Sequence, residues 1–180
     1  MDKPRIPPVI VQAHKLLDDA ENTMRRQCAL MNAAAGKTVI DEAHMVKHLD
    51  LFIRLVCLDL ACADSKITER EADLLNAIFR QSWPAEQYAA LQYDLKNQYQ
   101  NLLSKDMGAR LLACNITSAR LLRETYDPDG DWLLKTVSAL GQLIISSDRN
   151  ITADEKAHME ANLRKIHDEA VALLSSLAPS

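Results

Sequence analysis

The sequence predicts an all-helical protein, and three observations support this fold class. Four glycines and six prolines are all that the 180 residues contain, so few positions favour the turns that separate short strands. Apolar residues recur at helical spacing through most of the chain. A segment that reads as two helices joined by a short loop also occurs twice. At this length we expect one domain, residues 1–180.

The repeated segment consists of an apolar helix, the motif Asp-x-x-Ile-Thr-x-x-Glu and a second helix. The motif spans Asp64–Glu71 in the first copy and Asp148–Glu155 in the second. We therefore expect two helical hairpins, at residues 41–80 and 131–177, related by a pseudo-twofold axis. Together with the remaining helices they predict a compact bundle of about seven helices.

The first helix is expected over residues 9–35, because apolar residues recur there at helical spacing. Pro7 and Pro8 precede it and Gly36 follows it, as is common at helix starts and ends. We interpret residues 1–36 as an N-terminal helical extension of a core that spans 38–177. The long first helix could offer an apolar face to a second copy of the chain, so self-association as a homodimer is one hypothesis.

The second helix is expected over residues 38–63, with Asp41 in its first turn. Between Leu51 and Ala63 its only charged residues are Arg54 and Asp59, which predicts a helix that is buried nearly all round. The third helix is expected over residues 69–81. The spacing of Thr68 and Glu71 matches a capping box, in which each side chain bonds to the backbone N–H of the other.

Four more helices follow in the predicted order. The fourth contains the apolar and aromatic positions from Tyr88 to Leu102, and the fifth covers residues 105–125 with Leu121 and Leu122 facing inward. Asp127-Pro-Asp-Gly is a strong turn signal. The sixth helix is capped by Asp131, and the seventh is capped by Thr152 and runs to about Leu177.

Composition excludes several classes of function. A net charge of −4 offers no basic stripe for nucleic acid, and no apolar run reaches the ~18–20 residues of a membrane span. The four cysteines lie in apolar helical pattern, so we expect buried, reduced thiols and a cytoplasmic protein; they are Cys28, Cys57, Cys62 and Cys114. No Gly-rich phosphate loop, nucleophile elbow or cysteine–histidine pair is evident, so we expect no catalytic residues and no enzyme.

The repeated motif contains the candidate site residues. Asp64 and Asp148 are expected where an apolar helix ends, and a carboxylate there opposes the helix dipole. One interpretation is that each aspartate accepts hydrogen bonds from its own turn. The other is that Asp64, Glu71, Asp148 and Glu155, with loop carbonyls, hold a hard divalent cation. If the hairpins pair around the pseudo-twofold axis, the two loops could lie close together.

Two other clusters favour structural interpretations. The stretch Asp127–Asp131 resembles the opening of a calcium loop, but Trp132 and Ser138 stand where such a loop needs glycine and glutamate. His44 and His48 are four residues apart and could share a metal. No third ligand is apparent, so structural histidines are expected.

Residues 61–71 and 145–155 resemble the TerB-like family of tellurite-resistance proteins. The signature of that family is an alanine-rich helix that runs into Ala-Asp-Gly, a short loop and an acidic helix start. The resemblance covers roughly residues 38–170. The chain resembles a divergent member, because Ser65 and Arg149 stand where the family has glycine. Arg149 could also pair with the aspartate before it.

The resemblance implies an all-helical bacterial protein without catalytic activity, associated with resistance to tellurite and other stress. It also implies acidic loops that bind metal. The expected function is therefore a non-catalytic module that binds a metal ion or a protein partner through both loops, with no cofactor beyond such a divalent ion. Its ligands would be Asp64, Glu71, Asp148 and Glu155. The alternative is a purely structural or adaptor bundle that acts through protein contacts without metal.

Overall fold

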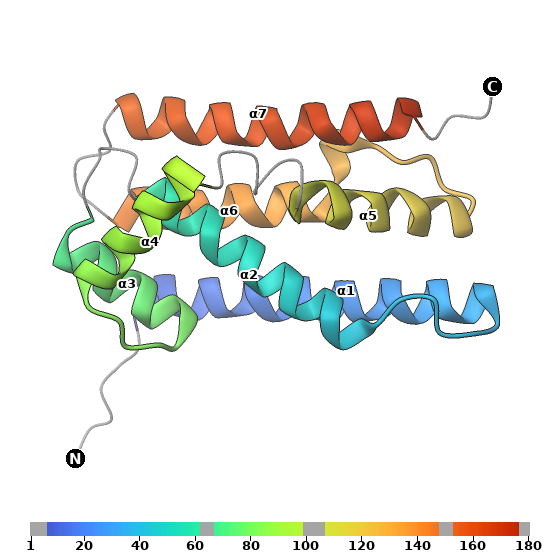
Figure 1. Cartoon of the computed structure of the whole chain (residues 1–180), viewed down its shortest axis with the longest axis horizontal. Helices are drawn as coiled ribbons and strands as arrows, with labels where there is room; N and C mark the ends of the chain where they lie inside the picture. The colour runs from blue at the N-terminus through green and yellow to red at the C-terminus, as the bar shows by residue number, and fades with distance from the viewer. Residues whose placement is uncertain (1–6, 62–66, 99–106, 148–152, 177–180) are drawn as a thin grey trace, which may run out of the picture.

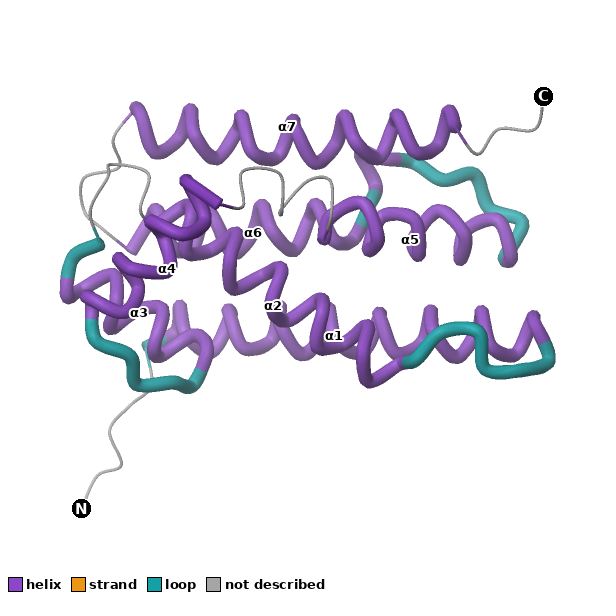
Figure 2. Tube along the Cα trace, in the orientation of Figure 1, coloured by secondary structure: helices purple, strands orange, loops and turns teal. Residues whose placement is uncertain are grey.

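A computed structural model describes residues 7–61, 67–98, 107–147 and 153–176, and these residues form an all-α bundle (Figures 1 and 2). This confirms the predicted fold class. The described residues contain seven α-helices and no strand, in the order α1 (Pro8–Ala35), α2 (Glu42–Ala61), α3 (Glu69–Phe79), α4 (Ala85–Gln98), α5 (Ala109–Leu121), the short 3₁₀ helix η2 (Pro128–Gly130), α6 (Trp132–Ser147) and α7 (Ala153–Ser176).

Helices α1, α5, α6 and α7 run roughly along the long axis of the molecule (Figure 1). In Figure 1, α1 lies along one side and α7 along the other, with α5 and α6 between them. Helix α2 crosses this layer obliquely and packs on both α1 and α6, while α3 packs on α1, α2 and α4 at one end of the bundle. Within the described ranges, no helix combines the length and apolar character that crossing a membrane requires.

Helix α1 contributes one face to the hydrophobic core of the bundle. Its residues Ala13, Ala20, Met24 and Cys28 recur on one face and are at most 2% exposed. They belong to the same hydrophobic cluster as the buried residues of α2 and α6. These positions are covered by α2, α5 and α6, so this face of α1 is not available to a second copy of the chain.

Helix α2 is buried nearly all round, as predicted. Its core residues include Phe52, Val56, Cys57 and Leu58, each at most 2% exposed. The helix begins at Glu42, later than expected, because Asp41 acts as its cap: the Asp41 carboxylate accepts a hydrogen bond from the His44 N–H at 3.1 Å.

The predicted end of the fifth helix is wrong. Helix α5 ends at Leu121, and Arg123 then adopts a left-handed conformation with φ 59°. The chain turns away to bring Tyr126 to the Asp131 carboxylate at 3.0 Å. Leu121 and Leu122 are consequently 42% and 53% exposed and do not face the core. The fourth helix is described as far as Gln98, so the predicted positions Tyr99 and Leu102 lie outside the described residues.

The two predicted hairpins correspond to α2–α3 and α6–α7. Their first helices approach closely: a Cβ atom added at Gly141 of α6 would lie 3.0 Å from Leu60 Cδ1 and 2.9 Å from Met159 Sδ. Their second helices differ, because α3 has 11 residues and α7 has 24. A pseudo-twofold relation between the hairpins stays a prediction.

Candidate functional site

The residues predicted to bind a metal are described only in part. Asp64, Asp148 and the capping residue Thr152 lie outside the described residues. Glu155 belongs to the first turn of α7, but its side chain also lies outside the described part of the structure. Glu71, in the first turn of α3, is the one predicted ligand whose side chain is described. The metal hypothesis therefore stays a prediction.

Glu71 forms the predicted capping box with Thr68. The Glu71 N–H donates to Thr68 Oγ1 at 3.2 Å, and Glu71 Oε2 accepts from the Thr68 N–H at 2.6 Å and from the Thr68 hydroxyl at 2.8 Å. This oxygen is already used within its own turn, so a cation bound through it would compete with two hydrogen bonds. Glu71 thus fits a metal-ligand role less well than a capping role.

A polar cluster joins the end of α2 to the beginning of α7. His158 Nε2 lies 2.9 Å from Asp59 Oδ2, and Asn162 Nδ2 donates to the same oxygen at 2.6 Å. The Asp59 side chain is only 17% exposed and that of His158 is 37% exposed. Because an ionised carboxylate accepts hydrogen bonds only, the proton in the contact belongs to His158 Nε2. We call Asp59, His158 and Asn162 the α2–α7 clamp.

The packing of α7 explains why these side chains meet. Met159 of α7 is buried beside Gly141 of α6, where Leu60 of α2 also lies. This packing holds the first turns of α7 against the last turn of α2. His158 and Asn162 are one helical turn apart and therefore share a face. A carboxylate on a helix as apolar as α2 is costly to bury unless it is hydrogen-bonded, and the two donors from α7 meet that requirement.

Sequence reasoning missed this cluster. The pattern identified Asp59 only as a charge on an apolar helix and gave no role to His158. One signal was available, since a charged residue in a buried helix needs a partner. The sequence did not indicate which residue, because Asp59 and His158 are 99 positions apart.

The histidine pair of α2, His44 and His48, makes structural contacts. The rings of His44 and His48 stack with centroids 6.2 Å apart, and His48 Nε2 lies 3.3 Å from the Met107 carbonyl oxygen. Burial lowers the pKa of His48. Within the described residues no group of three or more His, Cys, Asp or Glu side chains is placed to hold a metal.

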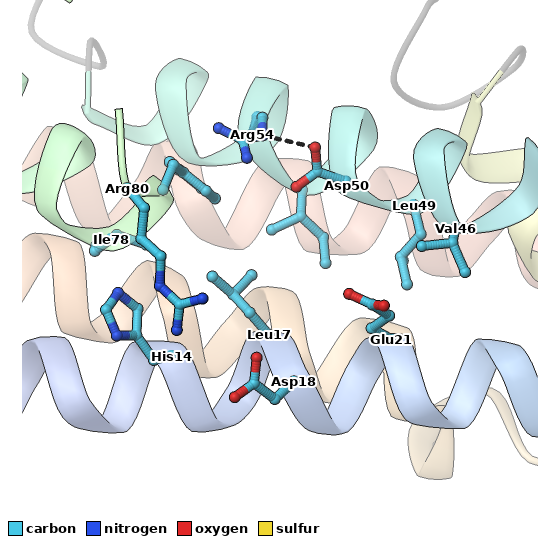
Figure 3. A pocket seen from close by; sticks show the side chains of 12 residues that line it. His14, Leu17, Asp18, Glu21, Val46, Leu49, Asp50, Arg54, Ile78 and Arg80 are labelled. Carbon is cyan, nitrogen blue, oxygen red and sulfur yellow. Dashed lines mark hydrogen bonds and ion pairs between the residues drawn. The ribbon is translucent and has the colours of Figure 1, made fainter. Parts of the chain in front are cut away.

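A small cleft of about 210 Å³ lies between α1, α2 and α3 (Figure 3). Arg54 pairs with Asp50 at 2.8 Å and lies over the Phe79 ring, 4.7 Å from its centroid. His14 Nε2 lies 3.0 Å from the Ala77 carbonyl oxygen. The lining carries charges of both signs, and its Arg54 is already paired with Asp50, so this cleft presents no single charge to a ligand.

The fold and the clamp define an all-α bundle in which two helical hairpins are joined through a partly buried carboxylate. No protein-family model, curated protein or solved structure matches the chain. The TerB-like resemblance therefore depends on the repeated motif itself.

Proposed function

We propose that the chain is a divergent, non-catalytic TerB-like module that binds a divalent metal ion or a protein partner through its two acidic loops. The binding face would lie where α2 and α6 end and where α3 and α7 begin. In this proposal the protein contributes to bacterial resistance to tellurite or another stress. It acts in the cytoplasm, where buried free thiols such as Cys28 and Cys57 stay reduced.

The α2–α7 clamp is the observation that carries this proposal. Asp59 lies five positions before Asp64, the first motif aspartate, and His158 lies three positions after Glu155, the last residue of the second motif. The hydrogen bonds of Asp59 to His158 and Asn162 hold together helix ends that flank both motifs. This supports the hypothesis that residues far apart in the chain form one binding face.

The chemistry of the motif favours a hard cation if a metal is the ligand. Carboxylate oxygens are the preferred ligands of Ca²⁺ and Mg²⁺. Because Glu71 Oε2 is engaged by Thr68, Asp64 and Asp148 are the ligands on which the proposal depends. The clamp would position the two loops and would not itself bind the ion.

Isothermal titration of chelator-treated protein with calcium, magnesium, manganese and zinc tests the proposal. We expect saturable binding that is lost in Asp64→Asn/Asp148→Asn, with helical content unchanged by circular dichroism. The matched control is Asp73→Asn/Asp168→Asn, which removes the same charge from exposed positions on α3 and α7 and should keep the binding.

If no ion produces heat or raises the melting temperature, the metal hypothesis is wrong. The chain would then be the structural or adaptor bundle that acts through protein contacts.

The role in stress is tested separately by growth of a tellurite-sensitive bacterium that expresses the wild-type chain or the Asp64→Asn/Asp148→Asn variant. Equal growth of the two strains on tellurite would contradict a role for the loops in resistance.

A further inference from the structure

A second cleft, of about 410 Å³, lies between α1, α5 and the segment 124–132. Its lining comes from α1, α5, the 122–131 segment and the start of α6, and includes no residue of α3 or α4. Gln27 and Leu30 line it from α1, Asn115 and Ser118 from α5, and Trp132 from the start of α6. Its volume falls within the range of small-molecule sites.

Four buried side-chain atoms, all from residues that line this cleft, have no hydrogen-bond partner. They are Gln27 Oε1, Asn115 Oδ1, Ser118 Oγ and Trp132 Nε1. In the described part of the chain no other buried side-chain nitrogen or oxygen atom lacks a partner, and all four belong to residues that line this one cleft. Burying a polar group without a partner is costly, and such groups concentrate where a protein is shaped for something besides stability.

The polar group next to these atoms is fully satisfied. Asp131 is 4% exposed; its Oδ1 accepts from the Leu133 and Leu134 N–H groups at 2.8 and 3.2 Å. Its Oδ2 accepts from Asn115 Nδ2 at 2.7 Å and from the Tyr126 hydroxyl at 3.0 Å. The unpaired atoms therefore do not reflect a region that is poorly hydrogen-bonded as a whole.

The contact with Asp131 fixes the orientation of Asn115. Because Nδ2 donates to the carboxylate, Oδ1 can only accept. The indole Nε1 of Trp132 can only donate. The Ser118 hydroxyl can donate or accept a hydrogen bond, and the Gln27 amide can rotate to present either its nitrogen or its oxygen. These two side chains therefore adapt to a ligand. Asn115 and Trp132 determine which hydrogen-bonding groups the ligand must have. A fitting ligand presents one donor and one acceptor.

The charges around the cleft exclude anions and favour a neutral ligand. Glu124, Asp127 and Asp131 line it with one opposing cation, Arg26, so an anion is repelled. A cation that carries only donors would leave Trp132 Nε1 unpaired. The side chain of Leu30 supplies an apolar wall beside the polar atoms.

We propose that this cleft binds a small neutral carboxamide or cyclic amide. The amide N–H donates to Asn115 Oδ1, and the amide oxygen accepts from Trp132 Nε1. The four atoms are covered from solvent in the structure, so the partly exposed side chains of Gln27 and Trp132 shift as the ligand enters. This site is independent of the acidic loops and of the function proposed for them.

Three probes of nearly equal shape test the proposal on the full chain. Benzamide is neutral and carries both a donor and an acceptor, benzoate is an anion with acceptors only, and benzamidine is a cation with donors only. The chain has two tryptophans, Trp83 and Trp132, whose indole N–H signals are observed by nitrogen–proton NMR and assigned with Trp83→Phe. We expect benzamide to shift the Trp132 signal saturably at low millimolar concentration, and benzoate and benzamidine to bind at least about tenfold more weakly.

Two variants connect the binding to the unpaired atoms. Ser118→Ala removes a buried hydroxyl from the cleft lining, so we expect weaker benzamide binding. Trp132→Phe should abolish binding by calorimetry, whereas Trp83→Phe should leave it unchanged.

The proposal is wrong if none of the probes shifts the Trp132 signal saturably, or if all three bind equally well. Benzamide binding that survives Trp132→Phe would also overturn it. The three probes are compared on the wild-type chain, so this comparison does not require Ser118→Ala or Trp132→Phe to fold.

Discussion

The Asp131 carboxylate is buried to 4% exposure and accepts four hydrogen bonds. Two come from N–H groups in the first turn of α6, which otherwise have no partner within the helix. The others come from Asn115 of α5 and from Tyr126, whose pKa is raised by burial and by the negative charge of Asp131. One residue predicted as a simple helix cap thus joins α5, the 122–131 segment and α6.

We predict that Asp131→Ala lowers the free energy of unfolding by about 3 kcal/mol or more. The substitution removes a helix cap worth ~1 kcal/mol and leaves two buried donors, Asn115 Nδ2 and the Tyr126 hydroxyl, without an acceptor. Urea unfolding measures the change.

The matched control is Asp129→Ala, which removes a carboxylate two positions away. The Asp129 side chain is 89% exposed and contacts His167 at 3.3 Å, so its loss should change stability by less than about 0.5 kcal/mol. Equal effects of the two substitutions would contradict the role assigned to Asp131.

At the scale of helices, the close approach of α2, α6 and α7 depends on Gly141. The backbone of α6 comes near Leu60 of α2 and Met159 of α7 because Gly141 has no side chain. Small residues at a helix crossing allow backbones to approach closely, and a tightly packed core does not readily accept added volume. The same approach holds the α2–α7 clamp together.

We predict that Gly141→Val lowers the free energy of unfolding by about 1–3 kcal/mol. The added methyl groups would overlap Met159 Sδ and Leu60 Cδ1 and push α7 away from α2. The comparison is Gln142→Val at the next, exposed position of α6, which should cost less than about 0.5 kcal/mol. A Gly141→Val protein as stable as wild type would show that the three helices can separate at no cost.

At the scale of the whole molecule, three buried thiols in the described part of the chain report on the integrity of the core; the fourth cysteine, Cys62, lies outside the described residues. Cys28, Cys57 and Cys114 are free and buried, as the sequence predicted. Burial raises the pKa of Cys57 and that of Cys114 from 9.0 to about 12. Such thiols stay protonated and unreactive while the bundle is folded.

The raised pKa of Cys57 predicts a loss of stability at alkaline pH. Below about pH 9 the thiol is protonated in both the folded and the unfolded chain and has no effect. Above pH 9 the unfolded thiol loses its proton while the folded one keeps it, so the free energy of unfolding falls as pH rises toward 12. One thiol contributes a slope of about 1.4 kcal/mol per pH unit.

We expect Cys57→Ala to flatten this slope by that amount between about pH 9.5 and 11, measured by urea unfolding at each pH. Val56→Ala is the control, because it also removes buried apolar volume from α2 but keeps the thiol and the slope. If both variants retain the wild-type slope, Cys57 ionises equally easily in the folded and unfolded chain.

The sequence by itself determined the local features of this protein. Helical periodicity predicted the all-α class, the buried helix α2 and the inward-facing thiols, because the faces of a helix follow from residues three and four positions apart. The capping box at Thr68 and the cap at Asp131 were also predictable, since each depends on residues within three positions of it. The end of the fifth helix was predicted four residues too late, because apolar spacing continues through Leu121 and Leu122 while the backbone turns away.

Only the tertiary structure decided which distant side chains meet. The α2–α7 clamp joins residues 99 positions apart, and the cleft with four unpaired polar atoms combines side chains from α1, α5 and α6. Local spacing contains no information about such contacts, because they depend on how helices cross and on where a residue such as Gly141 allows them to approach. A polar side chain on a helix face has the same sequence pattern whether it is solvated, paired or left without a partner.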